Sequence, residues 1–72
     1  MDKQTVKTNI LKILTRRKFE FAGIIADKVR EEFGNKQETT ARVLRDLRSE
    51  GKIIDTYLPT KEGKNYIAFK KV

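Results

Sequence analysis

Arg42, Gln37 and Thr39 are the side chains in this sequence whose chemistry is easiest to match to a ligand. The guanidinium of Arg42 is a planar fork of N–H donors that fits the O6 and N7 acceptors of guanine. Gln37 can bond bidentately to N6 and N7 of adenine, and Thr39 can bond a phosphate or touch a thymine methyl group. These residue types indicate a hydrogen-bonding surface, to which backbone N–H groups at a helix start would add an anion site.

Two carboxylates complicate this surface. Glu38 would repel phosphate, yet it could accept a hydrogen bond from cytosine N4. Alternatively, Glu38 pairs with Arg42 one helical turn later and stabilises the helix start, an effect of only about 0.5 kcal/mol. Both interpretations carry equal weight at this point. Asp46 also stands four residues from Arg42, and we interpret it as an intrahelical partner.

The charge balance suggests a polyanionic partner. The 72 residues include 17 Lys and Arg against 10 Asp and Glu, which gives a formal net charge of +7. A domain this basic commonly meets nucleic acid and sometimes an acidic membrane. No apolar run approaches the roughly 20 residues of a membrane span, and no signal-peptide core is present. We therefore expect a cytoplasmic protein that makes no use of a membrane.

The composition argues against catalysis and against metal binding. The sequence has no Cys and no His, so it lacks thiolate ligands, the commonest metal ligand and the commonest acid–base catalyst. Its carboxylates do not follow the spacing of a calcium loop. We expect a non-enzyme without a cofactor, formed by residues 1–72 as one domain. A chain of this length buries only roughly 60% of its unfolded surface.

The polar side chains need a helix to hold them, and residues 37–50 supply its pattern. Thr40, Val43, Leu44 and Leu47 share one side at helical spacing, and the charged residues fall on the other side. Gly51 ends the helix where a left-handed residue is favoured.

Two further helices are predicted before it. Residues 3–17 carry an apolar stripe of Val6, Ile10, Ile13 and Leu14, and the cations at 16–18 close this helix at its negative dipole end. Leu11 lies off the stripe, and we favour an isolated exposed side chain over a dimer seam. Residues 24–33 form the second helix, after a very short strand at 19–21. Gly34 then turns the chain steeply into the third helix.

The pattern becomes strand-like after Gly51. Residues 52–58 and 65–71 are predicted strands around a turn at 59–64, with Ile67 and Phe69 facing the core. Lys71 would protect an exposed sheet edge. Tyr57 and Tyr66 could stack on bases, but we favour packing on a sheet face.

Residues 38–53, ETTARVLRDLRSEGKI, resemble the recognition-helix signature of the winged helix-turn-helix family. The shared features are a Ser/Thr-rich start, an Arg, a Leu-x-x-Leu pair (Leu44 and Leu47) and an acidic-Gly-x-Ile run into a strand. The order of elements is similar over the whole chain. The resemblance implies an α+β fold, a three-helix winged helix-turn-helix with a C-terminal β-hairpin wing. It also implies that the third helix enters the DNA major groove and that the wing meets the backbone or minor groove.

The resemblance gives individual residues a role. Glu38, Thr39 and Arg42 occupy base- and phosphate-contacting positions, and Arg45 occupies a position that usually meets the backbone. Ala41 stands where many relatives have a hydroxyl donor, so one usual contact is missing. The full set of candidate DNA-binding residues, with those at the helix start and in the wing, is Lys36, Gln37, Glu38, Thr39, Arg42, Arg45, Lys61, Lys64 and Asn65.

We therefore expect non-catalytic binding of double-stranded DNA, as in a transcriptional or phage/plasmid-type regulator. The alternative is a winged-helix protein-interaction module, a subunit or inhibitor within a larger nucleic-acid-processing assembly. Leu11 and Ile24, which lie off the main apolar stripes, and the carboxylates of Glu38 and Asp46 motivate this alternative. A protein partner or a homodimer is compatible with both functions.

Overall fold

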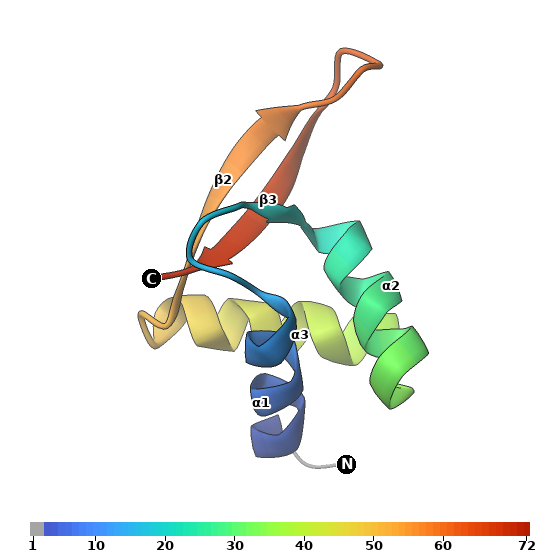
Figure 1. Cartoon of the computed structure of the whole chain (residues 1–72), viewed down its shortest axis with the longest axis vertical. Helices are drawn as coiled ribbons and strands as arrows, with labels where there is room; N and C mark the ends of the chain where they lie inside the picture. Colours follow the sequence, from blue (N-terminus) through green and yellow to red (C-terminus); the bar gives the residue numbers. More distant parts are fainter. Residues whose placement is uncertain (1–2) are drawn as a thin grey trace.

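Helix α3 (Gln37–Ser49) packs against both other helices and the base of a small sheet. The computed structural model describes residues 3–72 (Figure 1). The other elements are α1 (Lys3–Ile13), β1 (Glu20–Phe21), α2 (Ala22–Phe33), β2 (Ile53–Pro59) and β3 (Asn65–Lys71). This is the expected α+β arrangement of three helices followed by a β-hairpin.

The core forms where the apolar sides of the three helices meet the base of the hairpin. Thr40, Val43, Leu44 and Leu47 of α3 are all buried, as their spacing predicts. The rest of this core comes from α1, α2 and the strands: Val6, Ile10, Leu14, Ile25, Val29, Ile53 and Phe69. Burying one such aliphatic side chain contributes about 1.5–3 kcal/mol to the stability of the fold. This cluster therefore determines how α3 packs against the other elements.

Helix α1 ends at Ile13, earlier than the predicted end at residue 17. Directly after the helix the chain meets the sheet, where the carbonyl of Thr15 accepts a hydrogen bond of 2.9 Å from the N–H of Lys71 instead of an intrahelical one. Residues 16–18 therefore form an exposed bend, and the prediction that they close the helix is wrong. Leu11 is half-buried against the core, so the prediction of an isolated exposed side chain is wrong.

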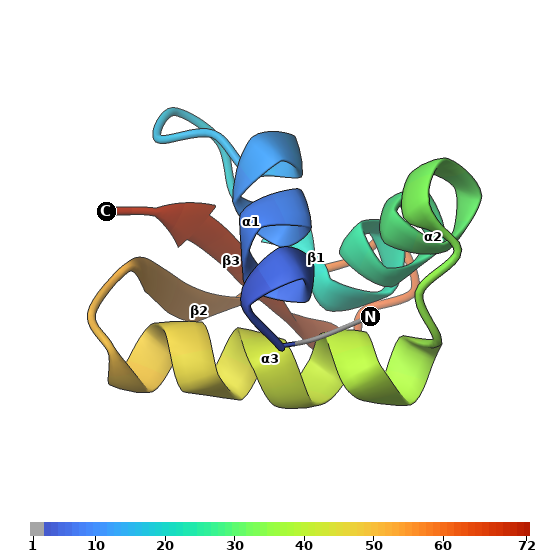
Figure 2. The same ribbon diagram turned by 90° about the horizontal axis from the view of Figure 1, so that it is seen from below.

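The connection between α2 and α3 is tight. Gly34 has φ 74° and donates its N–H to the carbonyl of Arg30, which confirms the predicted left-handed helix end. Lys36 precedes the first turn of α3, and its carbonyl accepts the N–H of Thr40 at 3.1 Å. Figures 1 and 2 show α2 and α3 crossing rather than running side by side, as the short connection requires.

The three strands are antiparallel, in the order β1-β3-β2. Phe69 of β3 pairs with Glu20 on one side and with Asp55 on the other. Lys71 therefore belongs to the middle strand, and its predicted role at a sheet edge is wrong. Phe69 is buried and Ile67 packs against the core, which confirms the predicted inward face.

The hairpin projects from the helices and ends in the loop of residues 60–64 (Figure 1). The N–H and the hydroxyl of Thr60 both donate to the carbonyl of Lys64, at 2.9 and 3.0 Å. Gly63 adopts φ 80° and donates its N–H to the carbonyl of Thr60. These bonds give the wing tip a defined shape. None of the helices within residues 3–72 is long and apolar enough to span a membrane.

Candidate nucleic-acid interface

The outer side of α3 presents two cations to solvent. Arg42 and Arg45 are exposed and three residues apart, so they are neighbours on the helix surface. Neither guanidinium has an ion pair or a hydrogen bond within residues 3–72. Arg48 differs, because its Nε lies 3.0 Å from Oδ1 of Asp55 on β2. Arg42 and Arg45 are thus available for an external acceptor.

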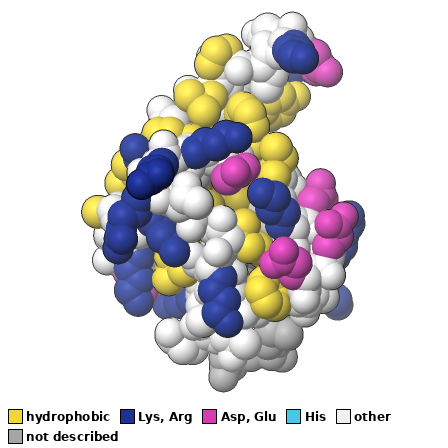
Figure 3. Space-filling view, in the orientation of Figure 1, with side chains coloured by type: hydrophobic (Ala, Val, Ile, Leu, Met, Phe, Trp, Pro, Cys, Tyr) yellow, Lys and Arg dark blue, Asp and Glu magenta, His cyan; other side chains and the backbone are white. Residues whose placement is uncertain are grey.

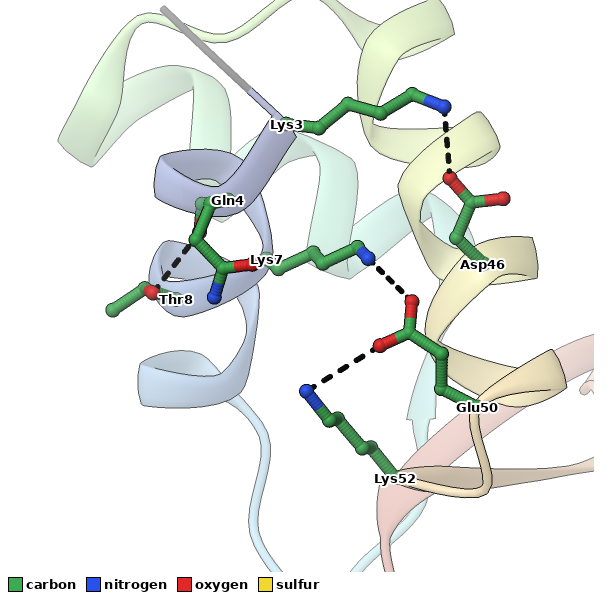
Figure 4. A network of polar contacts seen from close by, with 7 residues as sticks. All are labelled: Lys3, Gln4, Lys7, Thr8, Asp46, Glu50 and Lys52. Atoms are coloured by element: carbon green, nitrogen blue, oxygen red, sulfur yellow. Dashed lines mark hydrogen bonds and ion pairs between the residues drawn. The ribbon is translucent and has the colours of Figure 1, made fainter.

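The carboxylates towards the C-terminal end of α3 are engaged by other parts of the fold (Figure 4). Oδ2 of Asp46 lies 3.2 Å from Nζ of Lys3 on α1, so the predicted intrahelical pair with Arg42 is wrong. Glu50, directly after α3, accepts a hydrogen bond from Lys7 and lies 3.3 Å from Nζ of Lys52. The hydrogen bond from Lys7 lowers the pKa of Glu50, and the contact with Lys52 adds to this effect.

Glu38 is the carboxylate that shares the outer side of α3 with the two arginines. It is exposed in the first turn, and no ion pair joins it to Arg42 among the described residues. The structure therefore lacks the contact on which the purely structural interpretation of Glu38 depended. Its position at the positive end of the helix dipole remains favourable.

The remaining predicted residues of α3 lie around its start. Lys36 is the exposed residue that precedes the helix, Gln37 is exposed in the first turn and Thr39 is half-buried. Ala41, one turn after Gln37, is also exposed on this helix. Lys36, Gln37, Glu38, Arg42 and Arg45 are thus all accessible along a single helix.

The wing residues lie apart from this helix. Lys61 and Lys64 are exposed in the loop of residues 60–64, and Asn65 begins β3 opposite Pro59. The loop forms the tip of the hairpin, whereas α3 lies near its base (Figures 1 and 2). The structure does not bring the wing cations together with Arg42 and Arg45, so a ligand that touches both sets must be extended.

A groove with a volume of about 440 Å³ lies between α3 and the hairpin. Gln37, Ala41 and Arg45 border it on the α3 side, and Tyr57 borders it on the hairpin side. Tyr57 is 67% exposed, so the prediction that it packs on the sheet is wrong. Tyr66 is also exposed, at 47%.

Arg48 and Asp55 also line the groove, and sequence reasoning missed both. Arg48 follows Arg45 by three residues, a spacing that could have revealed it. The pairing of Arg48 with Asp55 depends on how β2 folds back along α3, which helical spacing does not show.

Among residues 3–72, no three His, Cys, Asp or Glu side chains come together as a group that could hold a metal ion. The chemistry that the described side chains offer is hydrogen bonding and charge.

Comparison with solved structures agrees with this arrangement. No family model and no curated protein matches the sequence. A crystal structure of a candidate transcriptional regulator from Thermoplasma acidophilum superposes with a TM-score of 0.82 at 15% sequence identity. The match covers 97% of this chain and 68% of the other.

The fold is a winged helix-turn-helix. In this winged helix, α2 and α3 form the helix-turn-helix and the β2–β3 hairpin forms the wing. The two chains share their fold at a low sequence identity, so the accessible side chains of α3 and the wing must be judged on their own chemistry.

Proposed function

We propose that this winged helix binds double-stranded DNA without catalysing a reaction. Helix α3 would enter the major groove, and the loop of residues 60–64 would lie on the adjacent backbone or minor groove. The observation that carries the proposal is the exposed pair of Arg42 and Arg45, which no carboxylate within residues 3–72 neutralises.

The roles of individual residues follow from their chemistry. Arg42 would bind the edge of a guanine, and Gln37 would bind the edge of an adenine or help to position α3 along the duplex. Thr39, Arg45 and Lys36 would contact phosphates, and Glu38 would accept from a cytosine amino group. Lys61, Lys64 and Asn65 would hold the wing on the backbone, where contact requires little ordering because the loop is already hydrogen-bonded.

The biological role that best fits is that of a regulator of the transcriptional or phage/plasmid type, acting in the cytoplasm on the nucleoid. The similar solved structure is described as a candidate transcriptional regulator, which supports this role. The net charge of +7 supports a polyanionic target through phosphate neutralisation and counterion release.

Substitution of the two arginines tests the proposal. Arg42→Ala should weaken binding by roughly 1–3 kcal/mol and relax specificity at one base pair, whereas Arg45→Ala should weaken binding to all sequences alike. The measurement is fluorescence anisotropy of labelled duplexes, after in vitro selection from random duplexes has supplied a preferred site.

Arg30→Ala is the matched control, because Arg30 is an exposed arginine on α2 whose contact is a 3.4 Å pair with Asp27. It should change affinity little. Unchanged duplex binding by both Arg42→Ala and Arg45→Ala, with folding intact, would exclude the proposed surface.

A second function has its own support, since several large apolar side chains are exposed. Ile24 is 42% exposed on α2, and Ile54, Tyr57 and Tyr66 are exposed on the hairpin. Such side chains suit a protein-interaction module, a subunit or inhibitor in a nucleic-acid-processing assembly, or a homodimer. This function predicts that a generic duplex at low salt leaves the amide resonances of residues 36–46 unchanged.

A further inference from the structure

A second group of cations lies at the base of the hairpin, away from the outer side of α3. Its members come from the α1–β1 connection, the start of β2 and the end of β3: Arg16, Arg17, Lys18, Lys52, Lys70 and Lys71. We call this group the basic flank. In Figure 3, Lys and Arg side chains gather over this side of the molecule.

Backbone hydrogen bonds hold the flank together. The N–H of Lys71 donates to the carbonyl of Thr15 at 2.9 Å, and the N–H of Val72 donates to the carbonyl of Lys52 at 3.2 Å. Nε of Arg16 donates to the backbone oxygen of Val72 at 3.0 Å. Three separate stretches of the chain thereby meet at the base of the hairpin, which residue order alone does not show.

Several of these cations make no ion pair or helix-end interaction that would explain their presence within residues 3–72. Helix α1 ends at Ile13, so Arg17 and Lys18 lie beyond its last turn. The side chains of Arg17, Lys18 and Lys71 form no ion pair within residues 3–72. By contrast, Lys70 lies 4.7 Å from the ring centre of Phe19.

Among the described residues, the nearest carboxylates form an ion pair with Lys52 of the flank and with none of its other cations. Glu50 is already bound by Lys7 as well as by Lys52. Glu20, which pairs with Phe69 beside Lys70, lies 3.9 Å from Lys28 on α2. Like charges without partners on one side of a molecule produce a positive potential, which decays over a Debye length of about 10 Å at 0.1 M ionic strength.

The flank and the outer side of α3 face in different directions. Helix α3 turns its buried side towards α1, so its exposed side points away from α1 and from the connection that follows it (Figure 2). The protein measures only 36 × 24 × 19 Å, whereas duplex DNA, with a persistence length of about 150 base pairs, resists a sharp bend over so short a distance. A duplex seated on α3 would therefore not reach the flank without severe bending.

We propose that the basic flank binds the phosphate backbone of a second DNA segment, so that one domain bridges two duplexes. This inference rests on the proposed function, because α3 must hold the first duplex. Contact at the flank would involve phosphates alone and would be independent of base sequence, since phosphate contacts carry no sequence information directly.

The experiment measures energy transfer between two short duplexes, one with a donor and one with an acceptor fluorophore, mixed with the protein at low salt. The wild-type protein should bring the duplexes together. Arg17→Gln/Lys18→Gln should weaken bridging about tenfold or more, because two phosphate contacts are lost. Its binding to a single duplex, followed by anisotropy, should change no more than about twofold, because α3 is untouched.

Lys28→Gln/Arg30→Gln is the matched control. It removes the same charge from exposed positions of α2, so a general effect of net charge would appear in both double variants. It should leave bridging unchanged. Thermal unfolding of both variants verifies that each remains folded.

The possible outcomes separate the two proposals. A wild-type protein that binds one duplex but never joins two overturns the bridging inference and leaves the proposed function standing. Bridging that survives Arg17→Gln/Lys18→Gln also overturns it, since a protein dimer would then explain the joining. Absence of any duplex binding overturns both. If the same variant loses binding to vesicles of phosphatidylserine and phosphatidylcholine while bridging persists, the flank's partner is an acidic membrane and the inference is wrong.

Discussion

At the scale of single residues, the decisive difference is between arginines that the fold uses and arginines that it leaves free. Arg48 is tied to Asp55, whereas Arg42 and Arg45 are not paired within residues 3–72. Helical spacing in the sequence predicted only part of this pattern. It placed Arg42 and Arg45 outside, but it assigned Asp46 to Arg42 when Lys3 is the partner.

The error for Asp46 has a physical origin. Intrahelical pairs can be read from a spacing of four residues, but a partner on another helix depends on how the two helices cross. Lys3 and Lys7 reach α3 because α1 lies across it (Figure 4). Sequence periodicity shows which side of α1 is buried and does not show which charged neighbours that packing brings within reach.

Glu50 provides a prediction for pH dependence. Its pKa is lowered from the usual value of 4.5, chiefly by the hydrogen bond from Lys7. The hydrogen bond between Lys7 and Glu50 therefore stabilises the fold fully at pH values above 4.5. This stabilisation is lost as the pH falls through the lowered pKa of Glu50. Glu50→Gln should be less stable than the wild-type protein near neutral pH, and the difference should shrink as the pH falls below 4.5 and through the lowered pKa of Glu50.

Thermal unfolding of both proteins across that range measures the effect of Glu50. High salt should reduce the difference at neutral pH, because the pair is exposed and its attraction is screened. A stability difference that is the same at every pH would show that the loss comes from packing and not from the charge of Glu50.

At the scale of elements, α3 is the part that the sequence specified best. Its four buried residues and its length were predicted, because the apolar period and Gly51 are both local signals. The strands were also placed within one residue at each end. The end of α1 and the position of β3 in the middle of the sheet were missed, since both depend on β3 pairing with residues far away in the chain.

The end of α3 can be tested through its glycine. Gly51 has φ 75° and directs its N–H to the carbonyl of Arg48, and the next N–H, of Lys52, reaches the carbonyl of Leu47. A Cβ at Gly51 would meet nothing within 4 Å, so the cost of Gly51→Ala is that of the backbone conformation alone. We expect a loss of roughly 1–2 kcal/mol in urea unfolding.

Gly23→Ala is the control for this substitution. Gly23 lies in α2, its φ is not positive, and its Cβ position is also open. Alanine there should stabilise the protein by roughly 0.4–1 kcal/mol, because it restricts the unfolded chain. If both substitutions stabilise the protein, the left-handed end of α3 is not a constraint on the fold.

At the scale of the whole molecule, the fold presents cations on two sides. The outer side of α3 carries Arg42 and Arg45, with the wing tip projecting apart from it, and the basic flank lies on a different side (Figures 1 and 2). The net charge of +7 in the sequence predicted a polyanionic partner but could not divide the charge between surfaces. That division appears only in the fold, where β3 and the residues after it bond to Thr15 and Lys52 and so bring three stretches of the chain to one end of the sheet.

The residues of the candidate site on α3 and in the loop of residues 60–64 could therefore be predicted, because each set belongs to one local element. The groove between α3 and the hairpin was not, because Tyr57 and Asp55 approach α3 only after the hairpin has folded back. The exposure of Tyr57 adds an aromatic side chain to this groove that could stack on a base or sugar.

The central claim, that α3 and the wing hold a DNA duplex, is tested most directly by following backbone amide resonances during titration with a short duplex at low salt. We expect the largest shifts at residues 36–46 and 61–65, and we expect them to reverse as salt is added, since phosphate contacts release counterions. If the resonances of residues 36–46 stay unchanged at saturating duplex, whatever happens on the basic flank, α3 is not the DNA-binding element and the account is wrong.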